Sequence, residues 1–206
     1  MIRDFIWGCS VPIVEHFLNK RYCIHFEGTL PRRGPYVLLP KHQSMLDPVL
    51  EGLLIRQTGR TANFLMRPFI EPLDFIFKFY GGISVIRAKD GYPEDEKAYV
   101  NKSAGQIAVH RFEEGEPVVI YQEKTRKYKK MDAINIVQNS PLDRLLKTGG
   151  PFYAVGNEYE DINKKGSNIW VRVGPPLYTT DKHVLKAYLE EKLSTLSRIS
   201  RNTDNS

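Results

Sequence analysis

Short apolar runs alternate with longer amphipathic stretches along most of this 206-residue chain. Seven of the runs have the length and composition of buried or half-buried strands: residues 21–28, 36–39, 62–66, 82–86, 117–121, 151–155 and 169–173. Helical periodicity predicts five helices: residues 48–57, 70–79, 94–113, 141–147 and 181–197. Strands that alternate with helices in this way indicate an α/β fold, in which a mostly parallel sheet is flanked by helices.

The N-terminal segment carries a pattern of its own. Residues 5–14 have no charge, but a spanning helix needs about 20 apolar residues, and the basic start and cleavage site of a signal peptide are missing. An aromatic and three aliphatic residues recur with helical spacing, on a helix that Pro12 can kink: Trp7, Val11, Val14 and Leu18. This amphipathic stripe either associates with a membrane interface or packs on the domain itself, and its periodicity does not distinguish the two.

Length and composition are those of one folded domain with a sizeable core. We expect an N-terminal amphipathic segment at residues 1–20, one domain at 21–198 and a disordered tail at 199–206. The 30 Lys and Arg residues exceed the 24 Asp and Glu residues by 6, which favours anionic partners such as phosphate headgroups, coenzyme phosphates or nucleic acid. The spacing of Cys9 and Cys23 matches neither a metal site nor a disulfide framework, so we expect no metal and a reducing compartment.

The most informative chemistry follows the predicted strand at 36–39, where His42 and Asp47 lie five positions apart. Histidine is the commonest general base in proteins, and a carboxylate partner fixes its tautomer. Side chains five apart on a regular helix diverge by about 140°, so these two meet only if the chain between them curls. Such a curl follows if Ser44 caps a helix in a capping box with Asp47, or if Asp47 is the cap before Pro48. In the alternative interpretation, Asp47 only caps the helix and His42 is an ordinary turn residue.

Charged residues also follow two other predicted strands. Gly82 belongs to a glycine turn and short strand that end at Arg87, whose guanidinium can clamp a phosphate with two parallel hydrogen bonds. A solvated surface arginine is the alternative. The strand at 117–121 leads into Glu123 and Arg126. Because ligands of open α/β sheets gather beyond the carboxyl ends of the strands, we expect these side chains to converge with His42 at one rim.

With these segments in order, the chain resembles the glycerophospholipid acyltransferases, typified by the lysophosphatidic acid acyltransferases. His42 and Asp47 match the His-x4-Asp block of that family, including its common Gln-Ser interior. The family's second block, a glycine followed by hydrophobic residues and an arginine, is matched by Gly82 to Arg87. The resemblance covers about residues 22–197.

The third block of the family is usually Pro-Glu-Gly-Thr-Arg, and it is matched only in part. Glu123, Thr125 and Arg126 agree with it, whereas Gln122 and Lys124 stand in place of the proline and the glycine. Because glycine allows backbone conformations that lysine resists, this change can reshape the acceptor pocket. A fourth block, normally a hydrophobic strand with proline, corresponds loosely to residues 151–155.

The resemblance implies an O-acyltransferase of phospholipid biosynthesis. It would move a fatty acyl group from acyl-coenzyme A or acyl-carrier protein, as co-substrate and without a further cofactor, to the hydroxyl of a lysophospholipid, chiefly 1-acyl-glycerol-3-phosphate. In this mechanism His42 is the general base and Asp47 orients its ring. Backbone amides near Ser44 would stabilise the thioester oxygen. The implied acceptor-binding residues are Arg87, Glu123, Thr125, Arg126 and Gly82.

The implied partners are the acyl donor, the lysophospholipid and a membrane surface, with peripheral or monotopic association on the cytoplasmic side. Two alternatives keep the family but change the function: a catalytically silent lipid-binding relative, and an acyltransferase for a different lipid acceptor. A third interpretation, nucleic-acid binding, comes from the basic and aromatic residues of the run at 121–130. Such runs are mostly solvated loops, so we expect no nucleic-acid partner.

Overall fold

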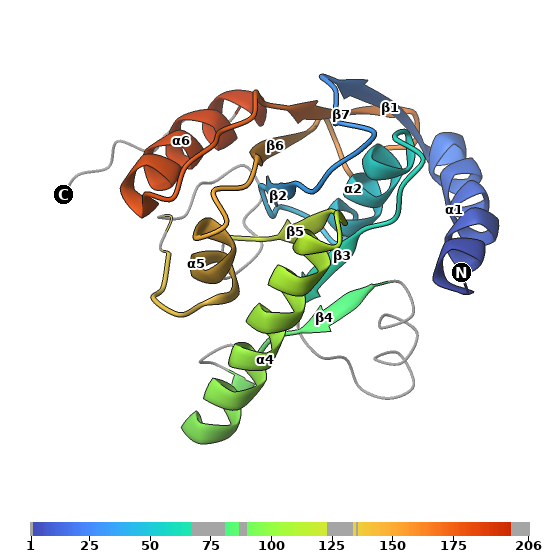
Figure 1. The fold of residues 1–206 in the computed structure, drawn as a ribbon. Coiled ribbons are helices and arrows are strands. Elements are labelled where there is room, and N and C mark those ends of the chain that lie inside the picture. Colours follow the sequence, from blue (N-terminus) through green and yellow to red (C-terminus); the bar gives the residue numbers. More distant parts are fainter. Residues whose placement is uncertain (1, 67–80, 87–89, 123–133, 135, 199–206) are drawn as a thin grey trace.

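The computed structural model describes residues 2–66, 81–86, 90–122, 134 and 136–198, with side chains from Trp7 onward (Figure 1). Its strands form one seven-stranded sheet in the order β1-β7-β6-β2-β5-β3-β4. The strands are β1 (Tyr22–Glu27), β2 (Val37–Pro40), β3 (Asn63–Met66), β4 (Gly82–Ser84), β5 (Val118–Ile120), β6 (Phe152–Tyr159) and β7 (Ser167–Val173). Neighbouring strands run parallel except β6 and β7, which are antiparallel. The prediction of an α/β fold with a mostly parallel sheet is confirmed.

Helices cover both faces of this sheet (Figure 1). They are α1 (Ile2–Arg21), α2 (Asp47–Arg56), α4 (Glu94–Glu113), α5 (Pro141–Leu146) and α6 (Lys182–Leu196). Successive residues of a strand point to opposite faces, and the core is divided accordingly. Leu38 of β2 packs into the layer shared with α1 and α2, whereas Val37 and Leu39 pack into the layer shared with α4, α5 and α6. The predicted helix at 70–79 and the predicted tail at 199–206 lie outside the described residues.

Strand β6 is longer than predicted. The apolar pattern gave residues 151–155, but the strand continues to Tyr159 because it pairs with β7 from Val155 to Tyr159. Gly156 is the first residue of this extension, and a Cβ atom there would collide with the backbone of Leu196 at the end of α6. The glycine that ended the apolar pattern is therefore the position at which β6 and α6 approach each other closely.

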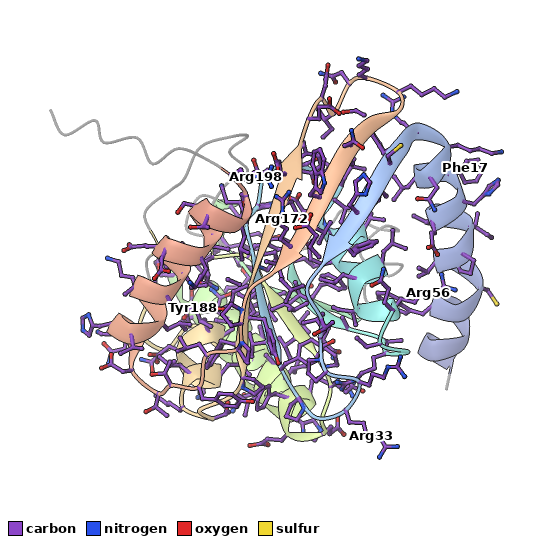
Figure 2. All side chains as sticks on the ribbon, turned by 90° about the horizontal axis from the view of Figure 1, so that it is seen from above. Phe17, Arg33, Arg56, Arg172, Tyr188 and Arg198 are labelled. Atoms are coloured by element: carbon purple, nitrogen blue, oxygen red, sulfur yellow. The ribbon has the colours of Figure 1, made fainter. Side chains whose placement is uncertain are left out.

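Helix α1 packs against the domain along most of the predicted stripe. Trp7 and Val11 are buried, and the Trp7 ring stacks on Phe64 with 6.4 Å between ring centroids. The opposite side of the helix exposes apolar side chains, with Ile13 58% and Phe17 65% exposed. Figure 2 shows Phe17 on this outer side. Membrane association of α1 stays a prediction.

In the described part of the chain, no helix combines the length and apolar character needed to cross a bilayer.

Candidate active site

The two residues of the His-x4-Asp pattern meet at the carboxyl end of β2. The distance between His42 Nδ1 and Asp47 Oδ2 is 3.0 Å. Because an ionised carboxylate only accepts hydrogen bonds, Nδ1 is the nitrogen that carries the proton in the neutral ring, and Nε2 is the basic one. The His42 side chain is 20% exposed and that of Asp47 is fully buried. The imidazole is therefore partly accessible to solvent, while the carboxylate bonded to its Nδ1 is buried.

Asp47 is surrounded by hydrogen-bond donors. Besides His42, the backbone N–H groups of Gln43 and Ser44 donate to Oδ2, at 2.6 Å and 2.7 Å. The amide nitrogen of Asn157 at 3.1 Å and the hydroxyl of Tyr159 donate to Oδ1. Asp47 also opens α2, where the positive end of the helix dipole favours a carboxylate. Five donors and a helix N-terminus thus fix this side chain in one orientation.

The start of α2 supplies the curl that the spacing requires. Leu46, and neither of the two predicted caps, takes the cap position, and no side chain caps it. One half of the expected capping box is nevertheless present, since the Asp47 carboxylate reaches back to the Ser44 N–H. The Ser44 hydroxyl in turn accepts from Leu46 N at 3.1 Å. The turn between residues 43 and 46 is therefore closed largely by the same carboxylate that holds His42.

A second carboxyl group, Glu51, lies one helical turn further along α2 and is completely buried. The amide nitrogen of Asn157 bridges the two groups, at 3.1 Å from Asp47 Oδ1 and 2.8 Å from Glu51 Oε1. Burial, followed by the nearby charge of Asp47, raises the pKa of Glu51 well above its ordinary value. This shift favours the neutral form of Glu51.

Tyr121 joins this cluster from the carboxyl end of β5. Its hydroxyl donates to Glu51 Oε2 at 2.6 Å, and its ring lies beside the His42 imidazole with 4.5 Å between centroids. Burial, followed by the neighbouring carboxyl groups, raises the pKa of Tyr121 and of Tyr159 well above the ordinary phenol value. Both phenols therefore keep their protons and act as hydrogen-bond donors.

Of the other predicted site residues, only Gly82 belongs to the described part of the chain. Arg87, Glu123, Thr125 and Arg126 lie outside the described residues. The strands that precede them, β4 and β5, run parallel to β2, so their carboxyl ends face the same rim as His42. Gly82 is the first residue of β4 and lies at the amino end of that strand.

The chain just before Arg87 is held firmly. Asn101 of α4 makes two hydrogen bonds with the backbone of Ile86: its Oδ1 accepts from Ile86 N at 2.9 Å, and its Nδ2 donates to Ile86 O at 2.8 Å. A side-chain amide that bonds both backbone groups of one residue mimics a neighbouring strand. The direction in which the chain leaves β4 is therefore fixed.

The backbone amides expected to stabilise a thioester oxygen are already in use. Gln43 N and Ser44 N donate to Asp47, and Leu46 N donates to the Ser44 hydroxyl. The expectation of an oxyanion site among amides near Ser44 is thus wrong for these three groups, because the turn consumes their hydrogen bonds.

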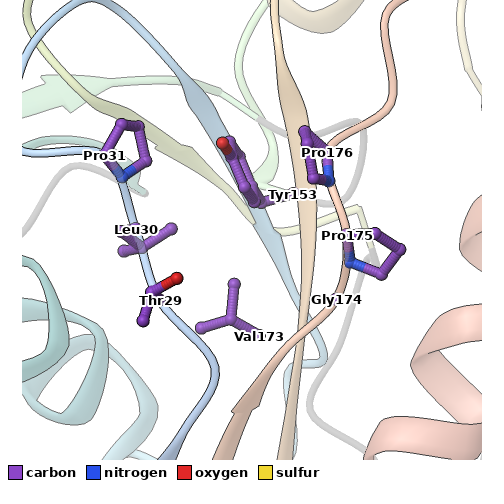
Figure 3. A pocket seen from close by; sticks show the side chains of 8 residues that line it. All are labelled: Thr29, Leu30, Pro31, Tyr153, Val173, Gly174, Pro175 and Pro176. Atoms are coloured by element: carbon purple, nitrogen blue, oxygen red, sulfur yellow. The ribbon is translucent and has the colours of Figure 1, made fainter.

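A groove of about 460 Å³ lies elsewhere, toward the amino end of β6 (Figure 3). It is lined by Thr29, Leu30, Pro31, Tyr153, Val173, Gly174, Pro175 and Pro176. His42 follows the carboxyl end of β2, which pairs in parallel with β6, so the groove and the His42 cluster lie toward opposite ends of these strands. Over the described residues, no group of three or more His, Cys, Asp and Glu side chains is arranged to hold a metal ion.

Sequence reasoning missed four members of the cluster: Glu51, Tyr121, Asn157 and Tyr159. One local signal was available for Glu51, a charged residue four positions after Asp47 within an otherwise apolar helical face. Asn157 and Tyr159 lie in the part of β6 that the apolar pattern left out, and they are 110 and 112 residues from Asp47 along the chain. No spacing within the sequence connects them to it.

Comparisons with known proteins agree with this architecture. A family model described as Acyltransferase matches residues 21–154. Among solved structures, the chain is similar to the crystal structure of the 1-acyl-sn-glycerophosphate (LPA) acyltransferase PlsC from Thermotoga maritima, with 15% sequence identity and a TM-score of 0.68. That match covers 94% of this chain and 78% of the other. A search of curated proteins finds no significant match.

Proposed function

The chain belongs to the acyltransferase family, and from this premise we propose that it transfers a fatty acyl group from an acyl thioester to the hydroxyl of a lysophospholipid. The donor is acyl-coenzyme A or acyl-carrier protein, and the acceptor that we favour is 1-acyl-glycerol-3-phosphate. The observation that carries the proposal is the His42–Asp47 pair, in which a partly exposed imidazole is bonded at Nδ1 to a buried carboxylate at 3.0 Å.

The reaction follows from the roles of the two ring nitrogens. His42 Nε2 takes the proton of the acceptor hydroxyl, while its oxygen attacks the thioester carbonyl carbon. The C–O bond forms, the C–S bond breaks, and the proton passes from His42 to the departing thiolate. Asp47 stabilises the transient imidazolium through the Nδ1 hydrogen bond and is held in place for this by its other donors. No acyl-enzyme intermediate is needed.

Recognition of the acceptor phosphate is assigned to residues beyond the ends of β4 and β5. Arg87 would hold the phosphate with Arg126, and Glu123 and Thr125 would complete the acceptor site, whereas Gly82, at the amino end of β4, would only begin the strand that leads to Arg87. Three inter-strand spacings separate β4 from β2, which puts the exit of β4 about 14 Å from that of β2 along the rim. A long arginine side chain and the glycerol phosphate arm of the acceptor together suit such a span. Asn101 fixes the backbone of Ile86, the residue before Arg87.

We also propose that the protein works at the surface of an anionic bilayer, on the cytoplasmic side. Ile13 and Phe17 form an exposed apolar strip on the outer side of α1. The Arg21 side chain donates to Asn163 O at 3.4 Å and so links the end of α1 to the β6–β7 connection, which exposes two lysines. That connection follows the carboxyl end of β6, the end near which His42 lies. The β6–β7 connection also exposes Glu160 and Asp161, so the basic groups that accompany the apolar strip are Lys20 and Arg21 at the end of α1. An apolar strip with such basic residues suits an anionic lipid interface.

The test is transfer of a labelled acyl group from acyl-coenzyme A to lysophosphatidic acid. We expect turnover by the wild type, a loss of about 100- to 10,000-fold in His42→Ala, and a higher acceptor KM with little change in kcat in Arg87→Ala. His110→Ala, an exposed histidine of α4, is the matched control and should keep full activity.

Two results would redirect the proposal. Lipid binding without turnover in wild type or His42→Ala would identify the silent lipid-binding relative. Turnover with other lysophospholipids but none with lysophosphatidic acid would identify a different acceptor, which the lysine at position 124 makes the principal alternative.

A further inference from the structure

Glu51 is a completely buried carboxyl group for which the reaction described above has no use. It lies four residues after Asp47 on α2, so the two side chains share one face of the helix. Burying an ionisable group is costly compared with leucine or methionine of similar volume. Packing alone therefore gives no reason for a glutamate at this position.

The contacts of Glu51 lead to both groups that hold His42. On one side, the Asn157 amide bonds Glu51 Oε1 at 2.8 Å and Asp47 Oδ1 at 3.1 Å. Two acceptors share the two hydrogens of one amide nitrogen, so the position of Glu51 determines where Asn157 can sit. Asn157 is itself fully buried.

On the other side, Glu51 Oε2 and the Tyr121 hydroxyl are hydrogen-bonded at 2.6 Å, and a neutral Glu51 can donate its proton in this bond. The Tyr121 ring lies 4.5 Å from the His42 ring between centroids, with 38° between their planes. Asp47 thus bonds the edge of the imidazole that carries Nδ1, and the Tyr121 ring lies beside the imidazole. Glu51 is hydrogen-bonded to Tyr121 directly and is connected to Asp47 through Asn157.

We propose that Glu51 is a positioning residue that fixes the orientation of the His42–Asp47 pair through its hydrogen bonds with Asn157 and Tyr121. The inference rests on the proposed function, because the orientation of His42 matters only if its Nε2 takes a proton from the acceptor. A neutral side chain suits this role, since it leaves Asp47 as the single negative charge beside the imidazole. The raised pKa of Glu51, caused by burial and by the charge of Asp47, agrees with this requirement.

The neutral role makes glutamine a suitable replacement. In Glu51→Gln, the amide oxygen accepts from Asn157 and the amide nitrogen donates to the Tyr121 hydroxyl, which accepts as well as donates. Glu51→Ala removes both tethers and leaves a cavity beside Asn157. Leu185→Ala is the matched control, because Leu185 is equally buried but belongs to the other core layer, with α6.

The experiment measures kcat, both KM values and their pH dependence in the acyl-transfer assay. We expect Glu51→Gln to keep wild-type kcat within about threefold, and Glu51→Ala to lower kcat about 10- to 100-fold with both KM values nearly unchanged. Leu185→Ala should lose stability but keep kcat. If Glu51→Ala does not fold, Tyr121→Phe replaces it, since it keeps the ring beside His42 but frees it from Glu51, and should lower kcat about 2- to 10-fold.

The pH profile separates a neutral Glu51 from an ionised one. A neutral group predicts that Glu51→Gln keeps the wild-type midpoint of the acidic limb of kcat/KM. A downward shift of that midpoint would show that the variant has lost a negative charge near the imidazole, and it would overturn the inference.

Two further outcomes would also overturn the inference. One is wild-type kcat in both Glu51→Ala and Tyr121→Phe while His42→Ala is inactive, which leaves the proposed function intact. The other is equal damage in the Gln and Ala variants of Glu51. Absence of turnover in the wild type would instead overturn the proposed function itself.

Discussion

The protonation of Glu51 makes a prediction about stability that needs no substrate. Burial and the charge of Asp47 raise its pKa in the folded protein, whereas in the unfolded chain the carboxyl titrates near its ordinary value of 4.5. Below about pH 4.5 both states bind the proton, and the contribution of Glu51 to stability is fully present. As the pH rises, the unfolded state releases its proton first, so the folded state loses stability until its own carboxyl ionises.

The size of this loss follows from the linkage between proton binding and folding. In the window above pH 4.5 where only the folded state holds the proton, the free energy of unfolding falls by up to about 1.4 kcal/mol per pH unit. Glutamine does not titrate, so Glu51→Gln removes this slope. Above pH 4.5 we therefore expect the variant to gain stability relative to wild type as the pH rises, and each pH unit of this gain is large beside the 5–15 kcal/mol typical of a domain.

Urea unfolding of both proteins at half-unit steps from pH 4.5 to pH 8 measures the difference directly, provided that the m values agree. Glu113→Gln is the control, because Glu113 is exposed on α4 and lies outside the buried cluster. A flat or falling difference for Glu51→Gln across this range would mean that Glu51 is ionised in the folded protein. That result would refute the electrostatic argument for a single charge on Asp47.

Three further predictions test the packing and the surface. Asp47→Asn should cost at least about 3–6 kcal/mol in urea unfolding, because its NH₂ group must face at least the two donors at Oδ1, at about 1.5–3 kcal/mol for each lost charge-assisted bond. A cost below about 1 kcal/mol would contradict the five-donor geometry. Gly156→Ala should lower the free energy of unfolding by about 1–3 kcal/mol, since the new Cβ collides with Leu196. The control Gly8→Ala, with open space around the position, should be neutral or stabilising. Equal effects of the two variants would contradict the close approach of β6 and α6. Replacing Ile13 and Phe17 together by serine should weaken sedimentation with anionic vesicles several-fold. Tyr99→Ser, which replaces a similarly exposed aromatic residue of α4, should leave sedimentation unchanged. Unchanged sedimentation of the Ile13 and Phe17 double variant would contradict a role of α1 in membrane binding.

The sheet was predictable from sequence because its central strands are covered on both faces. Val37, Leu38 and Leu39 are all fully buried, so β2 appears as a continuous apolar run and not as an alternating one. The same rule failed for β6, whose second half contains Gly156 and Asn157. That half is a strand because β7 pairs with it and α6 packs on it, and both partners come later in the chain. Sequence patterns report burial by local neighbours better than pairing with distant ones.

In the candidate site too, the residues close together in sequence were predictable and the distant ones were not. The His42–Asp47 pair was predictable, because both residues lie within one turn and the start of a helix. Asn157 and Tyr159, which complete the surroundings of Asp47, arrive from a strand more than a hundred residues away. Tyr121 lay in a segment that the sequence singled out for its charges, but its contact with the imidazole depends on β5 lying next to β2. Topology, and not spacing, brings these side chains to the pair.

The spacing of five between His42 and Asp47 has a structural cause that bears on how the site can be tested. The Asp47 carboxylate accepts from Gln43 N and Ser44 N, so it closes the turn that carries the chain from β2 into α2. The same oxygen, Oδ2, accepts from His42 Nδ1. Any replacement of Asp47 therefore loosens the turn and releases the imidazole together, and kinetics of such a variant cannot separate the two effects. Glu51 is hydrogen-bonded to Tyr121 and Asn157, so its variants change the support of the pair without removing the carboxylate that closes the turn.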